Sequence, residues 1–293
     1  MDIQPLLAFL AVAETGSFSG AARRLHLTQP AVSKRVLALE QELGVALFDR
    51  VGRGIRLTEA GTALLPVARR LRMDLGEARR VLAELDGRVR GTLRLVTSHH
   101  IGLHRLPGIL RDYTRRYPEV HLELGFLDSE AAFQAVARGE YELAIVTLPP
   151  QAPAELDVRL LWQDPLPIAV SREHPLARLE RPTPADLSPY RALLPAARTV
   201  TRMRIEHWLA VQGGFTGAVM EVNYLETLRS LTGIGLGWSA LPVSLLGPEL
   251  KVLDFPGGPP SRELGIARNR EISPSRAALA FEALLPPSSS NEC

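Results

Sequence analysis

A short run of polar residues near the N-terminus carries side chains that can read the bases of a nucleic acid. Five of them share the outward face of one predicted helix: Thr28, Gln29, Ser33, Lys34 and Arg35. Glutamine can pair with adenine through two hydrogen bonds, Arg and Lys can pair with guanine, and Ser or Thr can bond a base or a phosphate. An ordinary amphipathic helix with a solvated polar face would show the same pattern. The residue types alone leave both interpretations open.

Two short helices joined by a tight turn are predicted to position these side chains. The first spans about Phe18–Leu25, with Ser17 as the residue that caps its free N–H groups. The second spans about Thr28–Leu43, with Pro30 in its first turn and Gly44 at its end. The sides on which the helices meet carry small and aliphatic residues: Ala21, Ala22, Leu25, Ala31, Val32, Val36 and Leu39. Such a pair has the geometry that lays a second helix in a DNA major groove.

A basic hairpin is predicted after the second helix. Its strands lie near Leu47–Arg50 and Ile55–Thr58, with Gly52 and Gly54 in the turn. Three arginines give it positive charge: Arg50, Arg53 and Arg56. This charge suits contact with phosphates or with the minor groove. The alternative is a hairpin whose arginines are only solvated.

The N-terminal segment resembles the winged helix-turn-helix of the LysR-type transcriptional regulators. Four stretches carry the resemblance, in this order: GSFSGAARRL, TQPAVSKRV, LEQELGVALFDR and LTEAG. The resemblance implies that this segment binds double-stranded promoter DNA. We expect ten residues at that interface: Ser17, Thr28, Gln29, Pro30, Ser33, Lys34, Arg35, Arg50, Arg53 and Arg56.

A long amphipathic helix is predicted over residues 59–88, with Pro66 as a local kink. Its apolar residues recur in steps of four and three: Leu64, Ala68, Leu71, Leu75, Ala78, Leu82 and Leu85. This seam is typical of a two-helix coiled coil, and the charged opposite face, which includes Arg69 and Arg72, suits an exposed linker. The alternative is a helix packed on its own domain. We favour a homodimer that presents two recognition helices to two half-sites.

Strands and helices alternate in the rest of the chain, which predicts a parallel sheet covered by helices. Strands are expected at 92–97, 120–127 and 142–147, with helices at 103–116 and 130–138 between them. A second unit begins near residue 165, and the closing strand and helix can return to the first unit. The result is a hinged clamshell of two α/β lobes around a cleft.

The C-terminal half also resembles the LysR family, in the stretches GTLRLVT, VARGEYELAIV, SREHPLA and GIGLGWSALP. Tyr141 departs from the pattern, because that family usually has an aliphatic residue there. The resemblance implies an effector domain similar to the periplasmic binding proteins, and a homotetramer. The expected fold is therefore α/β overall, with a winged helix-turn-helix at 1–58, a coiled-coil linker helix and hinge at 59–90, and an effector-binding domain at 91–293. Within that domain, lobe I is expected at 91–163 plus 268–285, lobe II at 164–267, and a disordered tail at 286–293.

Hydroxyl and histidine side chains follow the expected strands at their carboxyl ends, where open α/β sheets bind ligands. Nine residues are candidates for contact with an effector: Ser98, His99, His100, Ser129, Thr147, Thr199, Thr201, Arg202 and Trp238. Hydroxyls and N–H groups at helix starts suit an anion or carboxylate, and Arg202 could pair with it. Each Ser or Thr can instead be a helix N-cap, and Trp238 can equally be a core residue.

Three histidines cluster after the first strand of this half: His99, His100 and His104. His100 and His104 are four residues apart and could share a helix face, a spacing that can bind metal. No carboxylate or cysteine that could complete a metal site lies nearby in the sequence, so we assign no metal ligands. A histidine that lines the cleft or responds to pH, and ordinary packing, are the alternatives.

The formal net charge of +2 is distributed unevenly. Residues 1–90 hold 14 Lys and Arg against 10 Asp and Glu, whereas residues 91–293 hold 20 against 22. The basic excess thus falls in the part expected to bind DNA. The single cysteine, Cys293, excludes a disulfide framework and a cysteine-based metal site. No signal segment or membrane span is recognisable, so the expected location is the cytoplasm.

Two other functions are weighed against a DNA-binding regulator. An enzyme built on the two-lobed half is disfavoured, because the chain has no nucleophile elbow, P-loop or dinucleotide glycine pattern. A solute-binding protein without DNA function leaves the first 90 residues unexplained. We therefore expect a regulator that senses a small effector, which can be an anion, and acts at a two-fold-symmetric promoter site. It needs no cofactor, and RNA polymerase is a further candidate partner.

Overall fold

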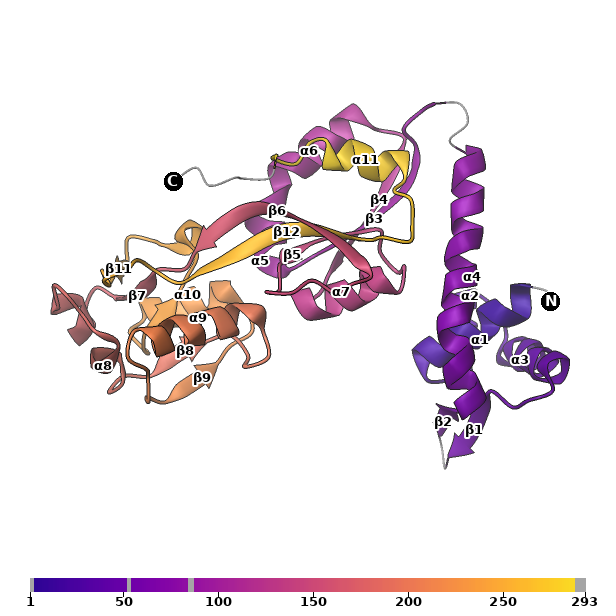
Figure 1. Ribbon diagram of the computed structural model, residues 1–293, viewed down its shortest axis with the longest axis horizontal. Coiled ribbons are helices and arrows are strands. Elements are labelled where there is room, and N and C mark those ends of the chain that lie inside the picture. Colours follow the sequence, from indigo (N-terminus) through magenta and orange to yellow (C-terminus); the bar gives the residue numbers. More distant parts are fainter. Residues whose placement is uncertain (1–2, 52–53, 84–86, 288–293) are drawn as a thin grey trace. The chain divides into compact units, whose positions relative to one another are not determined.

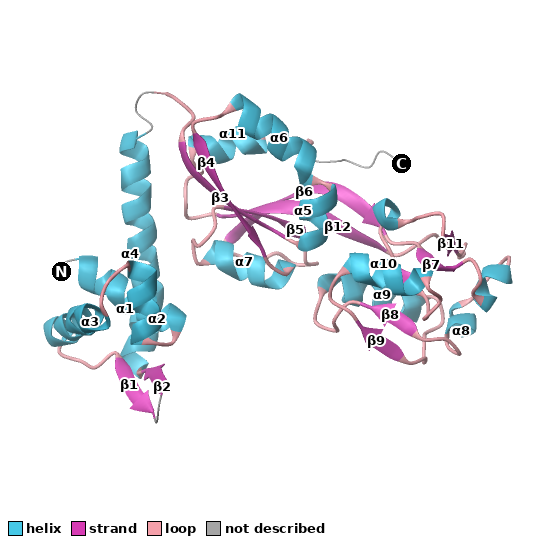
Figure 2. Ribbon diagram, turned by 180° about the vertical axis from the view of Figure 1, so that it is seen from behind, coloured by secondary structure: helices cyan, strands magenta, loops and turns pink. Residues whose placement is uncertain are grey.

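The computed structural model describes residues 3–51, 54–83 and 87–287 (Figures 1 and 2). The chain divides into two compact units, 1–85 and 86–293. The first unit contains helices and one small hairpin, whereas the second alternates strands and helices.

The N-terminal unit begins with α1 (Ile3–Thr15), α2 (Phe18–Leu25) and α3 (Gln29–Leu43). The antiparallel strands β1 (Phe48–Val51) and β2 (Gly54–Leu57) follow. This is the predicted helix pair and wing, preceded by a supporting helix. Buried small and branched residues fill the space between the three helices: Ala8, Ala11, Val12, Ala21, Ala22, Val32 and Val36.

Capping residues define the ends of α2 and α3, as the sequence predicted. The Ser17 hydroxyl accepts a hydrogen bond from the Gly20 amide at 2.9 Å, and the Thr28 hydroxyl caps α3 in the same way. His26 ends α2 in the left-handed conformation (φ 53°), and Gly44 ends α3 at φ 69°. A left-handed residue at this position satisfies the last helical carbonyl groups.

Helix α4 (Glu59–Ala83) is joined to this unit by apolar packing and by charge. Leu64 and Ala68 pack against the core of α1 and α3. Glu14 of α1, whose side chain is 8% exposed, lies 2.8 Å from the Arg24 guanidinium and 3.1 Å from that of Arg72. The first half of α4 is therefore part of the N-terminal unit.

The structure corrects three points of the prediction for α4. The first two residues of the apolar seam, Leu64 and Ala68, pack on their own domain. Arg69 and Arg72 are half-buried rather than exposed, because both face the Glu14 carboxylate. The last described helical residue is Ala83, and residues 87–90 have no regular secondary structure, so the helix does not extend to residue 88. Leu85 lies outside the described residues, and so does the side chain of Leu82.

Lobe I of the C-terminal unit is built on a five-stranded sheet of order β4-β3-β5-β12-β6. Strands β3 (Gly91–Thr97), β4 (Val120–Phe126) and β5 (Leu143–Thr147) are parallel, as predicted. Strand β12 (Ser261–Asn269) pairs antiparallel with both β5 and β6 (Leu156–Pro165). The sequence had predicted the three parallel strands and the return of the closing strand, but not β6.

Four helices cover this sheet: α5 (His99–His104), α6 (Leu106–Arg116), α7 (Ser129–Ala137) and α11 (Arg276–Glu282). Helices α6 and α11 lie on one face of the sheet and share one apolar cluster, whereas α7 lies on the other face above a second cluster (Figures 1 and 2). The predicted helix at 103–116 is in fact two helices, because α5 already begins at His99 and ends at His104.

Lobe II contains two small sheets. In the first, β7 (Ile168–Ser171) pairs antiparallel with β10 (Ser239–Ala240) and β11 (Leu250–Val252). In the second, β8 (Ala192–Leu194) pairs in parallel with β9 (Val219–Glu221). Three α-helices belong to this lobe: α8 (Pro184–Leu187), α9 (Val200–Val211) and α10 (Leu225–Gly233).

The lobes are connected by β6 and β12, which run side by side from lobe I into lobe II (Figure 1). Their register pairs Leu156 with Asn269 at one end and Pro165 with Ser261 at the other. All of β12 therefore belongs to the lobe I sheet. The predicted boundary between residues 267 and 268 is corrected, because the second crossing precedes Ser261.

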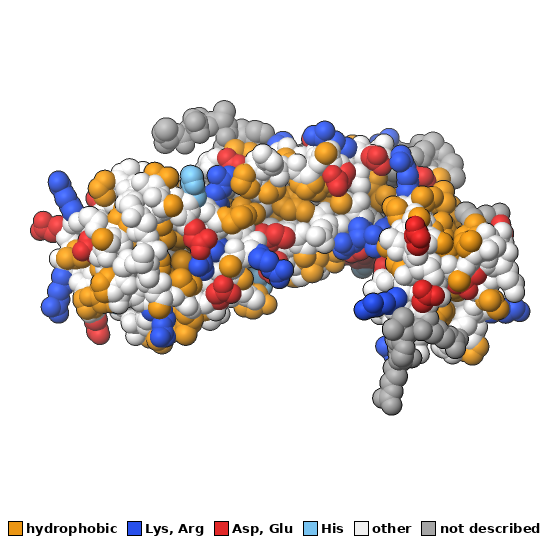
Figure 3. Space-filling model, turned by 60° about the horizontal axis from the view of Figure 1, so that its bottom comes forward, with side chains coloured by type: hydrophobic (Ala, Val, Ile, Leu, Met, Phe, Trp, Pro, Cys, Tyr) orange, Lys and Arg blue, Asp and Glu red, His pale blue; other side chains and the backbone are white. Residues whose placement is uncertain are grey.

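Charged side chains of both signs are interspersed over the face of the 86–293 unit seen in Figure 3. This distribution agrees with the nearly balanced count of 20 basic and 22 acidic residues in 91–293.

Candidate functional site

A cavity of about 80 Å³ lies between the two lobes of the C-terminal unit. It is lined by seven of the residues predicted to contact an effector: Ser98, His99, His100, Ser129, Thr147, Thr199 and Thr201. They come from the carboxyl ends of β3 and β5 and from the starts of α5, α7 and α9. A space of this size suits an ion or a compact small molecule.

Besides α5, three longer helices begin at this cavity. Ser129, Val200 and Leu225 are the first residues of α7, α9 and α10, and all three line it. The free amides of a helix N-terminus attract negative charge. Glu130 of lobe I already uses one of them, because its carboxylate accepts a hydrogen bond from the Val200 amide at 3.0 Å. A carboxylate of the protein thus bridges the lobes where an anion would bind.

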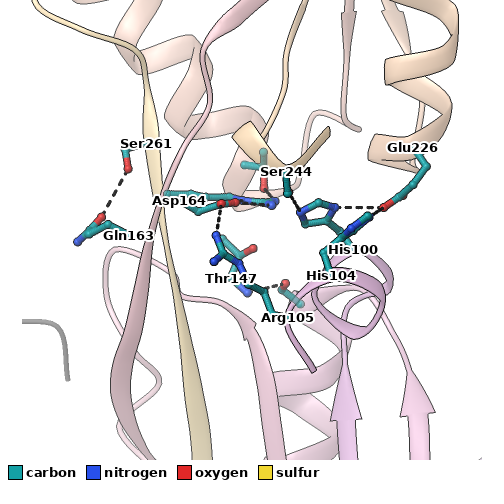
Figure 4. Close-up of polar contacts among 12 residues, drawn as sticks. His100, His104, Arg105, Thr147, Gln163, Asp164, Glu226, Ser244 and Ser261 are labelled. Atoms are coloured by element: carbon teal, nitrogen blue, oxygen red, sulfur yellow. Dashed lines mark hydrogen bonds and ion pairs between the residues drawn. The ribbon is translucent and has the colours of Figure 1, made fainter. Parts of the chain in front are cut away.

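Arg262 supplies a buried positive charge beside the cavity. It lies on β12 opposite Asp164 on β6, and its Nη2 is 2.8 Å from the Asp164 Oδ2. Its Nη1 donates a hydrogen bond of 3.0 Å to the Thr201 hydroxyl. Arg105 donates to the second oxygen of Asp164 at 3.1 Å (Figure 4). Two guanidinium groups therefore share one carboxylate, which leaves an excess of positive charge at this point.

The buried guanidinium of Arg262 is nevertheless a charged group. Burial lowers the pKa of Arg262, and the neighbouring Asp164 carboxylate opposes that effect. An arginine begins from so high a pKa that it keeps its proton. The cavity is thus lined by a permanent cation, hydroxyl groups and helix N-termini, together with the acidic side chains of Asp128, Glu130 and Glu226.

His100 connects the lobes on another side of the cavity (Figure 4). Its Nδ1 lies 3.1 Å from Oε1 of Glu226 on α10, and its Nε2 lies 3.4 Å from the Ser244 hydroxyl. His104 reaches the same Glu226 oxygen through Nε2 at 3.2 Å. Burial and then the charge of Arg262 lower the pKa of His100 to about 4, against the opposing hydrogen bond with Glu226. The imidazole is therefore neutral at neutral pH.

Two of the predicted effector residues, Trp238 and Arg202, do not line the cavity. Trp238 is fully buried in the apolar core of lobe II and packs edge-on against Phe215. Arg202 is buried with its guanidinium directed to Glu206 at 2.7 Å and to the Pro195 carbonyl at 3.2 Å. The cation at the cavity is instead Arg262, sixty residues further along the chain.

Glu130 and Glu226 are two further cavity residues that no sequence pattern singled out. Each reaches across to the other lobe, Glu130 to the amide of Val200 and Glu226 to the two histidines of α5. A local pattern cannot reveal such contacts, because they join residues at least seventy positions apart. The one available signal was that both glutamates fall in the first turn of a helix.

The predicted DNA-reading face lies at the N-terminal half of α3. Thr28, Gln29, Pro30 and Lys34 are exposed, and Ser33 and Arg35 are half-buried. The Gln29 amide donates a hydrogen bond of 3.1 Å to the Ser33 hydroxyl, and Arg35 donates one of 3.2 Å to the Gln4 side chain of α1. These contacts orient the side chains and leave donors on both available for other partners.

The remaining predicted DNA contacts lie before α2 and on the wing. Ser17 is the N-cap of α2, so its hydroxyl has a structural partner. Arg56 is exposed on β2. Arg50 pairs with Ile55 across the hairpin, but its side chain lies outside the described residues, as does the whole of Arg53.

Comparison with known families decides the class of the protein. Residues 3–62 match the family described as "Bacterial regulatory helix-turn-helix protein, lysR family", and residues 86–287 match "LysR substrate binding domain". The chain belongs to the LysR family. It is therefore a LysR-type transcriptional regulator with a DNA-binding and an effector-binding domain, and not an enzyme.

Curated relatives of this LysR-type regulator agree. The HTH-type transcriptional activator CmpR of Synechocystis is 31% identical over 256 residues, which cover 86% of this chain and 84% of CmpR. The RuBisCO operon transcriptional regulator of Allochromatium vinosum is 28% identical over 285 residues, covering 95% and 94% of the two chains. A regulator from the ibpB–leuC intergenic region of Azotobacter vinelandii is 67% identical over 107 residues, covering 36% of this chain and 74% of that one.

Solved structures show the same fold. A full-length OxyR variant from Pseudomonas aeruginosa superposes with a TM-score of 0.73 at 24% identity, covering 99% of each chain. Full-length CbnR complexed with its target DNA superposes with a TM-score of 0.64 at 23% identity, covering 97% of this chain and 99% of CbnR. Among the described residues, no helix is both long and apolar enough to cross a membrane.

Proposed function

We propose that this LysR-type regulator reads promoter DNA with the N-terminal half of α3. Gln29, Ser33 and Lys34 contact base edges, while Arg56 on the wing contacts phosphate. The exposure of Gln29, Lys34 and Arg56 supports this assignment. The hydrogen bonds that orient Gln29 and Arg35 support it as well, because a fixed side chain loses less entropy when it binds a base.

The protein acts as a homo-oligomer on a two-fold-symmetric site in the cytoplasm, where its promoter DNA lies. The C-terminal half of the α4 seam, which includes Leu71 and Leu75, joins two copies. Leu71 is 36% exposed within one chain, which supports its availability to a second copy. A tetramer that contacts RNA polymerase at the promoter is part of the same proposal. The functional boundaries are 1–58 for DNA binding, 59–90 for the linker and 91–293 for effector binding.

The effector is a small anion, such as a compact carboxylate, that binds between the lobes. The buried guanidinium of Arg262 carries this assignment, because it lies among the hydroxyls and helix N-termini of an interlobe cavity. Glu130 blocks the α9 N-terminus in the conformation described here. An anionic effector would therefore compete with Glu130 for the amides of α9 and change the contact between the lobes.

Two measurements on the full-length protein test this function. Fluorescence anisotropy with the gene's own upstream DNA and with random DNA should show specific binding at least about 10³-fold tighter. Affinity should fall linearly with the logarithm of salt concentration. A thermal-shift screen of small carboxylates, phosphate and sulfate should find ligands that raise the melting temperature of the wild type but not of Arg262→Met. Equal affinity for both DNAs would reject the DNA assignment. If no anion raised the melting temperature of the wild type, or if Arg262→Met responded equally, the anion assignment would be rejected.

A further inference from the structure

His100, His104 and Glu226 form a three-residue cluster across the two lobes (Figure 4). The histidines lie one turn apart on α5 of lobe I, with ring centroids 4.6 Å apart. Glu226 comes from the first turn of α10 in lobe II. Oε1 of Glu226 lies 3.1 Å from Nδ1 of His100 and 3.2 Å from Nε2 of His104. Two imidazoles and a carboxylate thus converge on one point.

These separations match those between ligands of a single metal ion. Bonds of about 2.0–2.2 Å in a tetrahedral zinc site place neighbouring ligand atoms roughly 3.3 Å apart. In this cluster one potential ligand atom from each residue lies within 4.8 Å of the other two. The three ligand atoms are therefore close enough together to surround a single ion.

The surroundings of the cluster also suit a metal ion. A histidine that binds metal through one nitrogen usually donates a hydrogen bond from the other. If Nδ1 of His100 is the ligand, its Nε2–H points to the Ser244 hydroxyl 3.4 Å away. The second carboxylate oxygen of Glu226, Oε2, is buried and has no hydrogen-bond partner among the described residues. A metal ion would satisfy this atom, because a carboxylate can bind through either or both oxygens.

We propose that His100, His104 and Glu226 bind one divalent transition-metal ion of the zinc type, which joins lobe I to lobe II. The two imidazole ligands favour zinc, nickel or copper over magnesium or calcium, which prefer sites made of oxygen ligands. Three protein ligands leave a fourth position for water, as in other open zinc sites. His100 and Glu226 also line the cavity proposed for the anion, but the metal site needs no anion, and the positive charge of the anion site is provided by Arg262. The ion would hold the lobes together whether or not DNA is bound.

The test uses full-length protein from which any affinity tag has been removed, since a histidine tag itself binds these metals. After treatment with EDTA and dialysis, the protein is titrated with ZnCl₂ by calorimetry and with CoCl₂ by visible absorption. The wild type should bind one ion per chain, with Co²⁺ bands typical of tetrahedral coordination. His104→Gln and Glu226→Gln should each weaken binding by at least 10-fold. His121→Gln, at an exposed position of β4, is the matched control and should bind like the wild type.

Folding is checked by thermal melting in EDTA. His104 is partly exposed, so His104→Gln should melt at the wild-type temperature and remain a valid test even if Glu226→Gln is unstable. Zn²⁺ should raise the melting temperature of the wild type and of His121→Gln, but not that of His104→Gln. The proposal is overturned if the wild type binds no stoichiometric Zn²⁺, or if His104→Gln binds as tightly as the wild type.

Discussion

Asp164 and Arg262 are directly opposed in the β6–β12 ladder, at the end where both strands enter lobe II. Their side chains are 2% and 5% exposed, and the ion pair measures 2.8 Å. The pair therefore lies at the crossing between the lobes and beside the cavity. A change at this ion pair should therefore affect both the stability of the crossing and the binding of the proposed effector.

We expect Arg262→Met to destabilise the protein by about 3 kcal/mol, because it leaves the buried Asp164 carboxylate with one cation fewer. Arg268→Met is the matched control on the same strand. The Arg268–Asp157 pair is 33% and 48% exposed, so its loss should cost under about 1 kcal/mol. Urea unfolding followed by circular dichroism measures both. Equal losses of stability in the two variants would show that the buried Asp164–Arg262 ion pair contributes no more than the exposed Arg268–Asp157 pair.

We expect Lys34→Ala to weaken promoter binding and, if the ammonium contacts phosphate as well, to lower the slope of log affinity against log salt by about 1. The chain offers a matched control, because Lys251 is its other lysine and donates to the Ala177 carbonyl in the C-terminal unit. Lys251→Ala should leave DNA binding unchanged. Fluorescence anisotropy at several salt concentrations measures both variants. If Lys34→Ala binds promoter like the wild type, the outward face of α3 is not the reading face.

We expect Leu71→Glu to shift the protein towards monomer, because it places a charge in the apolar seam proposed to join two copies of α4. Ala63→Glu is the control, since this exposed position lies on the same helix but outside the seam. Light scattering coupled to size exclusion gives the mass, and circular dichroism verifies folding. A folded Leu71→Glu variant with the mass of the wild type would place the dimer contact elsewhere.

We expect stability to depend on the protonation of His174. Its Nδ1 accepts a hydrogen bond from the Leu176 amide at 3.2 Å, and burial lowers its pKa below 6.5. Below about pH 6.5 the unfolded chain binds a proton that the folded chain rejects. This contribution to stability is therefore complete above pH 6.5 and is lost as the pH falls towards the folded-state pKa.

His174→Asn tests this dependence, because its side-chain oxygen can accept the same amide hydrogen bond without titrating. The stability lost between pH 7.5 and 5.5 should be smaller in this variant, by up to about 1.4 kcal/mol per pH unit below pH 6.5. Urea unfolding in EDTA at each pH measures the difference. His207→Asn at an exposed position of α9 is the control. An equal loss in His174→Asn and the wild type would show that another group titrates.

Local signals were enough to predict the helix pair and the three parallel strands. Ser17, Thr28 and Gly44 mark helix ends by chemistry that acts within one turn, so the sequence and the structure agree there. Strand β6 was missed because its charged residues, Asp157, Arg159 and Asp164, interrupt the apolar pattern. Their partners lie far away in the sequence: Arg268 donates a hydrogen bond to Asp157, and Arg262 donates one to Asp164.

Only those residues of the candidate site that are marked by nearby features of the sequence could be predicted. Hydroxyl residues after strands and at helix starts do line the cavity, because topology alone brings those positions together. The direction of a side chain is decided by packing, which is why the sequence could not show that Arg202 and Trp238 lie away from the cavity. The charged partners across the lobes, Glu130, Glu226 and Arg262, depend on contacts between distant parts of the chain.

The anchoring of α4 through Glu14 has a consequence for the promoter itself. The start of α4 is held to the same unit as α3. Two copies paired along α4 would therefore keep their reading helices at a fixed distance from each other. The arrangement would then measure the spacing and rotational phase of the half-sites as well as their bases. Insertion of about five base pairs, half a turn of DNA, would move one half-site to the opposite side of the duplex and abolish simultaneous binding.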